Sequence, residues 1–166
     1  NASQPCPHCV PVGIGAALAH PEGRAELIGA GIHMQPSVGR ATFQLVGKER
    51  VILVSDSLRA RGMPGGKYPC GGQEIVVHGN RATMADDPNT LAGSVTSLMG
   101  CVRQAVKFGI PMADAVRAAS FNPACVIGID DRAGSLEKGK EASFVLLDET
   151  DLSVRAVVFK GVCGEG

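Results

Sequence analysis

Four apolar residues in a row, Val51-Ile52-Leu53-Val54, are followed at once by Ser55 and Asp56 and form the clearest pattern along this chain. Such a run, rich in β-branched side chains, is typical of a parallel strand that is buried on both faces. Active sites of α/β proteins gather at the carboxyl ends of these strands. Asp56 is therefore the first catalytic candidate, and a helix cap or a turn after the strand is the alternative.

The segment before this strand predicts a strand, helix, strand unit. Apolar residues recur on one helical face between residues 37 and 45, which predicts a helix there. Residues 21–28 predict a short helix that ends at Gly29, and residues 32–34 predict a brief strand or strand end. His33 would then lie at the boundary of an element, next to the strand that leads to Asp56 in a βαβ arrangement.

Two pairs of short strands are predicted further along. Residues 74–78 and 81–84 are joined by Gly79-Asn80, which marks a two-residue hairpin. Residues 142–147 and 154–159 are joined by an acidic turn. The chain is expected to make a small antiparallel excursion in its middle and to end in β-structure.

Helices are predicted between these two pairs of strands. Ser94 is expected to cap a helix that reaches about Phe108, because apolar residues then recur near helical spacing. Pro111 opens a second helix after Gly109, and Asn122-Pro123 begins a short third one.

The charge balance narrows the class of partner. The chain has 16 basic and 16 acidic residues, so no broad electrostatic field favours nucleic acid or an anionic membrane. A small metabolite is the expected partner. No apolar run approaches the roughly 20 residues of a membrane span, and no signal-peptide pattern opens the chain. A soluble cytoplasmic protein is the expectation.

The six cysteines do not form the dense pattern of a secreted disulfide scaffold, and we expect most of them to be reduced. Cys101 and Cys125 lie in apolar helical stretches, where a small buried thiol is the ordinary interpretation. Cys6-Pro7-His8-Cys9 leaves two alternatives open, a redox dithiol and half of a zinc site. A second pair of ligands at zinc-site spacing is not recognisable in the sequence.

An ordered set of short motifs gives the sequence its most specific signal. The motifs are Asn1-Ala2, Gly15-Ala16-Ala17, Gly31-Ile32-His33, Leu53-Val54-Ser55-Asp56, Gly72-Gln73-Glu74, Leu91-Ala92-Gly93-Ser94, Ala119-Ser120-Phe121-Asn122-Pro123-Ala124 and Gly134-Ser135-Leu136 with Gly139-Lys140. In their order and spacing they resemble the C-terminal part of the N-acetylglucosamine-6-phosphate deacetylases, metal-dependent members of the amidohydrolase superfamily. The resemblance extends over essentially all 166 residues.

The resemblance implies an α/β fold, the C-terminal portion of a (β/α)₈ TIM-type barrel with a small β-sandwich domain. His33 and Asp56 would mark the ends of the seventh and eighth barrel strands. Residues 1–64 and 91–129 would belong to the barrel, and residues 65–90 and 130–166 to the small β-domain.

The implied reaction is hydrolysis of the acetamide of N-acetylglucosamine 6-phosphate to glucosamine 6-phosphate and acetate. By resemblance, Asp56 is the catalytic acid/base, and His33 hydrogen-bonds the substrate near its acetamide. Asn1 and Ala2 and the loop Leu91-Ala92-Gly93 correspond to positions that contact the sugar phosphate. A divalent metal, with zinc favoured, would act on the water, and its ligands in the family are a Glu and two His on earlier strands that are outside this sequence.

Three positions depart from the family pattern: Cys9 stands where an Arg contacts the phosphate, Ala30 replaces an Asp and Ser3 replaces a Met. Three hypotheses follow. The chain is part of a deacetylase completed by an N-terminal part, or a non-catalytic binding or structural module, or a redox protein that uses Cys6 and Cys9. Homo-oligomerisation is open in each case.

Overall fold

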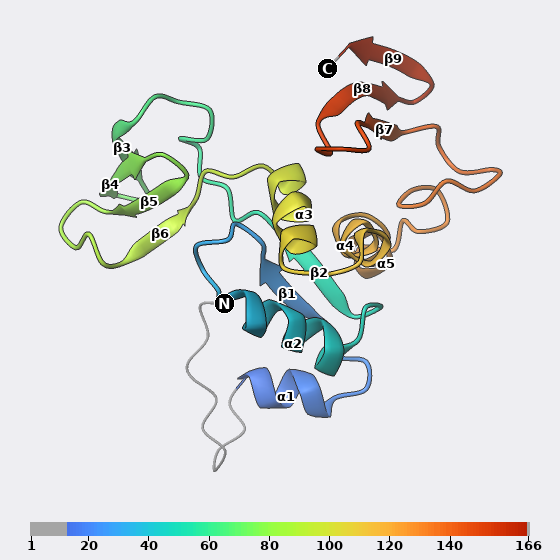
Figure 1. Cartoon of the computed structure of the whole chain (residues 1–166), viewed down its shortest axis with the longest axis horizontal. Helices are drawn as coiled ribbons and strands as arrows, with labels where there is room; N and C mark the ends of the chain where they lie inside the picture. The colour runs from blue at the N-terminus through green and yellow to red at the C-terminus, as the bar shows by residue number, and fades with distance from the viewer. Residues whose placement is uncertain (1–12, 166) are drawn as a thin grey trace.

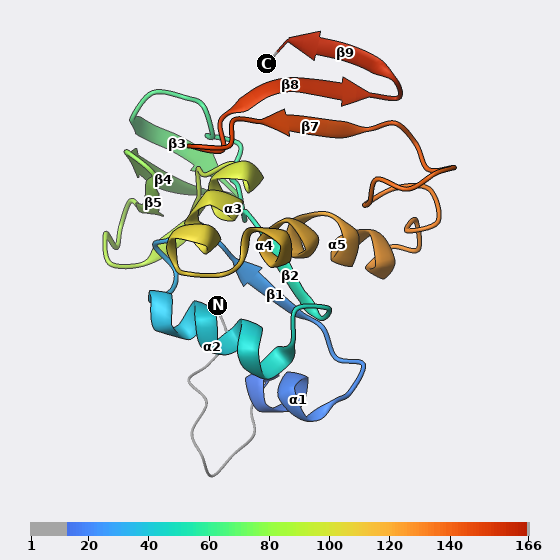
Figure 2. The same cartoon turned by 45° about the vertical axis from the view of Figure 1, so that its right-hand side comes forward.

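The computed structural model describes residues 13–165. A parallel pair of strands lies at the centre, formed by β1 (Ala25–Ile28) and β2 (Val51–Val54), and α2 (Pro36–Val46) connects them. A βαβ unit is therefore present, with the predicted helix and second strand, but its first strand is residues 25–28 and not residues 32–34; β2 coincides with the apolar run. Figures 1 and 2 show α2 alongside the β1–β2 pair.

The helices cover one face of the β1–β2 pair. Leu27, Val51 and Leu53 point to this face and pack in one buried cluster with side chains of α2, α3 (Leu98–Lys107) and α4 (Met112–Ala119). Because side chains alternate along a strand, Ile52 and Val54 point to the opposite face. Ile52 is 6% exposed, so β2 is buried on both sides at its centre.

Two antiparallel sheets lie outside this core (Figure 1). One has four strands in sequence order, β3 (Gly66–Cys70), β4 (Gln73–His78), β5 (Arg81–Met84) and β6 (Leu91–Ser94). The other has three, β7 (Phe144–Leu147), β8 (Val154–Phe159) and β9 (Val162–Glu165). Both predicted strand pairs are confirmed, and β3, β6 and β9 are additional strands. The assignment of residues to a barrel and a β-domain stays a prediction.

Three local predictions were wrong. Residues 21–28 do not form a helix, because residues 25–28 pair in parallel with β2 as β1; a further helix, α1 (Gly13–Ala19), precedes them. Residues 32–34 do not form a strand but lie in the loop between β1 and α2. Ser94 does not cap α3: it ends β6, and the Ser97 hydroxyl accepts the hydrogen bond from the Gly100 amide that caps the helix.

The two later helices appear as predicted, and the last one fixes the start of β2. Pro111 precedes α4, and α5 spans Phe121–Val126. Asn122, which is 1% exposed, donates from Nδ2 to the carbonyl oxygens of Lys48 and Val51, each at 2.7 Å. One buried amide therefore satisfies two carbonyl groups at the entrance of the central strand.

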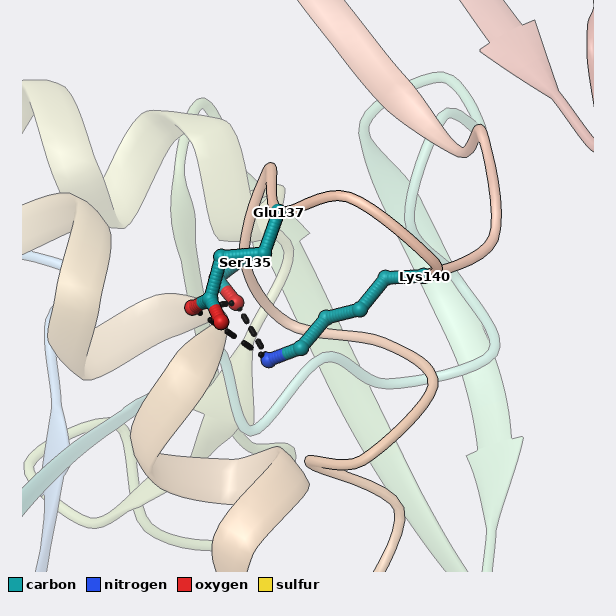
Figure 3. A network of polar contacts seen from close by, with 3 residues as sticks. All are labelled: Ser135, Glu137 and Lys140. Carbon is teal, nitrogen blue, oxygen red and sulfur yellow. Dashed lines mark hydrogen bonds and ion pairs between the residues drawn. The ribbon is translucent and has the colours of Figure 1, made fainter.

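Polar contacts join the last sheet to the helices. Arg103 of α3 donates to the Leu152 carbonyl oxygen in the turn between β7 and β8, at 2.8 and 3.0 Å. Figure 3 shows Lys140, in the segment before β7, pointing at Ser135 and Glu137, with the Ser135 Oγ 2.6 Å from its Nζ. The same Nζ lies 5.3 Å from the centre of the Phe121 ring on α5. These contacts fix the entry of the chain into the last sheet.

We expect Asn122→Ala to lower the free energy of unfolding by about 2–4 kcal/mol, because two carbonyl groups lose their partner and the one at Val51 is buried. The measurement is urea unfolding. Asn89→Ala, at an exposed position, is the matched control and should change stability by less than about 0.5 kcal/mol. Equal losses in the two variants would contradict this role of Asn122.

Candidate active site

Asp56 lies two residues beyond the end of β2, at the carboxyl edge of the parallel pair. Its side chain is exposed, and no described residue donates a hydrogen bond to its carboxylate. The carboxylate is therefore not used as a cap in the described part of the chain. Its backbone has φ 49°, in the left-handed region that non-glycine residues rarely occupy. A free carboxylate on a constrained backbone at a strand end fits a chemical role better than a structural one.

Strand β6 lies directly against the segment that carries Asp56. The Ser94 amide donates to the Asp56 carbonyl oxygen at 2.9 Å, and the Leu58 amide donates to the Ser94 carbonyl oxygen at 2.8 Å. An isolated parallel bridge joins Ser57 and Ser94. The structure thus brings the end of β6, Gly93 and Ser94, next to Asp56, although more than 35 residues separate them in sequence.

Gly93 permits this close approach. It is buried, has φ 143°, and a Cβ atom placed on it would lie 3.0 Å from the Leu58 side chain and 3.3 Å from the Asp56 carbonyl oxygen. An L-residue would be strained here by its backbone conformation and by crowding. Gly93 is therefore required for β6 to pack on the Asp56 segment, whether or not it also touches a ligand.

His33 lies in the loop after β1, near Asp56. Burial lowers the pKa of its imidazole below the ordinary 6.5, and the Asp56 carboxylate opposes this shift. The two side chains are thus close enough to interact electrostatically. The His33 Nδ1 atom is buried and has no hydrogen-bond partner among residues 13–165. An unsatisfied buried nitrogen beside a free carboxylate is an arrangement that a bound ligand could complete.

The loop that carries His33 packs on α3. A Cβ atom on Gly29 would lie 2.7 Å from the Cys101 Cβ, and one on Gly31 would lie 2.9 Å from the Gln104 side chain. Cys101 is fully buried, and burial raises the pKa of its thiol to about 11. Cys101 is thus an unreactive packing residue, as the sequence predicted, whereas Cys125 is only half-buried.

Some predicted residues are outside the described part. Asn1 and Ala2, and the redox or zinc motif Cys6 to Cys9, are among the first twelve residues and are not described. Within residues 13–165, no group of three or more His, Cys, Asp or Glu side chains could hold a metal ion. The same residues include no helix that is long and apolar enough to cross a membrane.

Ser94 is the residue at this site whose place the sequence did not reveal. The sequence placed Ser94 at a helix start, since serine often caps helices and an apolar helical pattern follows. The structure instead puts it in β6, where it bonds to the Asp56 segment. The available signal was Gly93 inside a short apolar run, which marks a close backbone approach in a strand.

Comparison with known proteins identifies the family of this chain. The model of the "Amidohydrolase family" matches residues 32–163. The chain belongs to the amidohydrolase family. Members of that family are generally metal-dependent.

Among the amidohydrolases, this chain is similar to deacetylases of amino-sugar phosphates. This amidohydrolase chain is 37% identical over 162 residues to N-acetylglucosamine-6-phosphate deacetylase of Bacillus subtilis (strain 168), which covers 97% of this chain and 40% of that protein. It is 37% identical over 155 residues to N-acetylgalactosamine-6-phosphate deacetylase of Escherichia coli O157:H7, and the match covers 93% of this chain and 40% of that protein. The chain thus spans about two fifths of the length of these two relatives.

Solved structures agree over the same extent. An N-acetyl-D-glucosamine-6-phosphate deacetylase mutant from Mycobacterium smegmatis, in complex with N-acetyl-D-glucosamine-6-phosphate, matches with a TM-score of 0.90 and 34% identity over 98% of this chain and 43% of that one. The N-acetylglucosamine-6-phosphate deacetylase of Thermotoga maritima matches with a TM-score of 0.88 and 28% identity over 96% of this chain and 43% of that one. The predicted membership of the N-acetylglucosamine-6-phosphate deacetylases is confirmed, and so is the partial amidohydrolase fold, in which the barrel is not closed.

We expect Gly93→Ala to destabilise the chain by roughly 2 kcal/mol or more, because the added methyl group meets Leu58 and the backbone conformation is strained. Gly128→Ala is the matched control: Gly128 has φ 68°, but nothing lies within 4 Å of its added Cβ. It should therefore cost only about 1 kcal/mol. Urea unfolding measures both, and a smaller loss for Gly93→Ala than for Gly128→Ala would argue against close packing of β6 on the Asp56 segment.

NMR titration of His33 tests its proximity to Asp56. We expect its imidazole to titrate below pH 6.5. Asp56→Asn should lower that pKa further, because it removes the negative charge that favours the imidazolium. Asp131→Asn, at an exposed position after α5, should leave the His33 titration unchanged. An unchanged or raised His33 pKa in Asp56→Asn would show that the two side chains do not interact electrostatically.

Proposed function

We propose that this chain contributes the acid/base carboxylate and part of the substrate site to a metal-dependent deacetylase of N-acetylglucosamine 6-phosphate. The carrying observation is the free, exposed Asp56 beyond the end of β2, which interacts electrostatically with His33 and whose backbone is bonded to the end of β6. The likeness to a deacetylase bound to this sugar phosphate supports the substrate class. Hydrolysis would give glucosamine 6-phosphate and acetate, a step in the use of amino sugars.

The chemistry assigned to Asp56 is proton transfer. An amide is a poor electrophile, so the attacking water must lose a proton and the leaving amine must gain one. Asp56 accepts the proton from water as the oxygen adds to the acetamide carbon, and it returns the proton to nitrogen as the C–N bond breaks. A carboxylate without a hydrogen-bond donor among the described residues is available for both transfers.

The role assigned to His33 is to orient the acetamide. Its lowered pKa keeps the ring neutral near pH 7, so one nitrogen donates a hydrogen bond and the other accepts one. A donor aimed at the acetamide oxygen stabilises the negative charge that develops there. The unsatisfied Nδ1 supports a ligand-dependent partner for this ring.

The remaining contacts would hold the sugar phosphate. In the Leu91-Ala92-Gly93 stretch of β6, Ala92 and Gly93 are small and would let a sugar approach the backbone closely. Asn1 and Ala2 are assigned the same role by resemblance. The partner is a small-molecule sugar phosphate in the cytoplasm, not nucleic acid or a membrane, and self-association is compatible with this role.

The metal belongs to the complete enzyme. A divalent ion, with zinc favoured, would supply Lewis-acid activation of the water. The described residues do not fit such an ion, since they form no cluster of three ligand side chains. The resemblance instead assigns the ligands to a Glu and two His of earlier strands. Residues 1–64 and 91–129 would complete that barrel, while residues 65–90 and 130–166 would form the small β-domain.

The alternative is a binding or structural module without catalysis. A hybrid enzyme separates the two: the N-terminal part of the Bacillus subtilis deacetylase is joined to this chain where the alignment begins. We expect zinc-dependent acetate release from N-acetylglucosamine 6-phosphate by the hybrid. Asp56→Asn should lower its kcat by roughly 10²- to 10⁴-fold, because the general acid/base is lost. Asp131→Asn serves as the control with unchanged turnover.

The outcomes of this assay are distinct. Full activity of the Asp56→Asn hybrid would remove the catalytic assignment, and a well-folded hybrid without turnover would favour the module. The assay should also include N-acetylgalactosamine 6-phosphate, because the Escherichia coli relative named for that substrate is equally similar, at 37% identity. A higher kcat/KM for that sugar would correct the substrate but leave the role of Asp56 intact.

A further inference from the structure

The backbone of Asp56 must be held in place by its surroundings. Its φ of 49° lies in the left-handed region, which side chains other than glycine adopt at a cost. Such a conformation persists only where neighbouring contacts fix it. The described residues that contact this short segment therefore determine the direction in which the Asp56 side chain leaves the backbone.

Ser94 supplies these contacts. It is fully buried, and its hydroxyl donates a hydrogen bond to the carbonyl oxygen of Ser55. Its amide donates to the carbonyl oxygen of Asp56 at 2.9 Å, and its carbonyl oxygen accepts from the Leu58 amide at 2.8 Å. One residue thus bonds to the residue before Asp56, to Asp56 itself and to the second residue after it.

The hydroxyl of Ser94 both donates and accepts a hydrogen bond. While it donates to Ser55, it accepts a hydrogen bond from the Thr96 amide at 3.2 Å. A second bond crosses the same junction, since the Ser57 hydroxyl donates to the Thr96 carbonyl oxygen at 2.8 Å. These bonds join the end of β2 to the end of β6, the strand that also contains Leu91-Ala92-Gly93.

We propose that Ser94 is a positioning residue that holds the left-handed backbone of Asp56 and so fixes where its side chain leaves the chain relative to the Leu91-Ala92-Gly93 stretch of β6. The functional meaning of this role rests on the proposed activity of Asp56. Ser94 acts through Asp56 and does not touch the substrate. A residue in this place must be small, because the site is fully buried, and must carry a hydroxyl, because the Ser55 carbonyl oxygen needs a donor.

Two substitutions and one control test the proposal. Ser94→Ala removes the hydroxyl and keeps the backbone bonds possible, whereas Ser94→Thr retains a hydroxyl. Ser97→Ala is the matched control, because it deletes a serine hydroxyl three residues away that caps α3 and does not contact Asp56. Both alanine variants should lose thermal stability to a comparable extent.

The first readout is amide hydrogen exchange in the 166-residue chain, which requires no activity. In Ser94→Ala, exchange at residue 94 and at Leu58 should accelerate by about tenfold or more relative to Ser97→Ala, because these amides form the bonds that flank Asp56. Ser94→Thr should restore much of the protection. Equal exchange at the two amides in Ser94→Ala and Ser97→Ala would overturn the positioning role, whatever the enzyme does.

The second readout is the division between kcat and KM in the hybrid enzyme. Ser94→Ala should lower kcat roughly 10- to 100-fold with little change in KM, because a misplaced acid/base slows proton transfer more than it weakens binding. Ser97→Ala should keep kcat within about twofold, and Ser94→Thr should recover part of the loss. A raised KM with unchanged kcat would overturn the proposal. An inactive parent hybrid would count against the proposed function alone, and the hydrogen-exchange result would then decide the role of Ser94.

Discussion

The structure depends on the burial of the parallel β1–β2 pair beneath three helices. Val51 and Leu53 are 0% and 2% exposed and share one apolar cluster with residues of α2, α3 and α4. Burying such side chains provides most of the favourable free energy of folding, at about 25 cal/mol per Å² of apolar surface. Because the packed face fixes the register of β2, it also fixes where the strand ends, and Asp56 follows two residues later.

The second constraint is that β6 contacts both the four-stranded sheet and the segment that carries Asp56. It pairs with β5 as the last strand of the four-stranded sheet, and Ser94 at its end bonds to the segment after β2. Ile75, Val77 and Ala82 give that sheet a small core of its own, to which Ala60 adds a side chain from the segment after Asp56. The four-stranded sheet is therefore connected to the candidate site where the chain enters it, after Asp56, and where the chain leaves it, at Ser94. A shift of the sheet would therefore move β6 and the Asp56 segment together.

Patterns that depend on local physics were predictable from the sequence. The four apolar residues of β2, the helical face of α2 and the Gly79-Asn80 hairpin reflect strand burial, helical periodicity and turn geometry, each of which acts over a few residues. Residues 25–28 could not be recognised as a strand in this way, because Ala-Glu-Leu-Ile suits a helix until β2 offers a partner. Ser94 was misplaced for a related reason: its hydrogen-bond partners lie near residue 56, and no local pattern indicates them. Asp56 could be found because a strand end is a local signal, whereas its contacts with His33 and β6 are tertiary.

The candidate site divides between what this chain determines locally and what it does not. The hydrogen bonds that hold the backbone around Asp56 all lie within residues 55–96. His33 is different, since burial lowers its pKa while its Nδ1 finds no partner among the described residues. A buried polar atom normally has a hydrogen-bond partner. Of the two residues, Asp56 has its backbone held by the described part of the chain, and His33 is the one whose environment a ligand or further strands would complete. The bonds of Ser94 reach the segment of Asp56 and not the imidazole of His33, so the two halves of the candidate site are held by different parts of the structure.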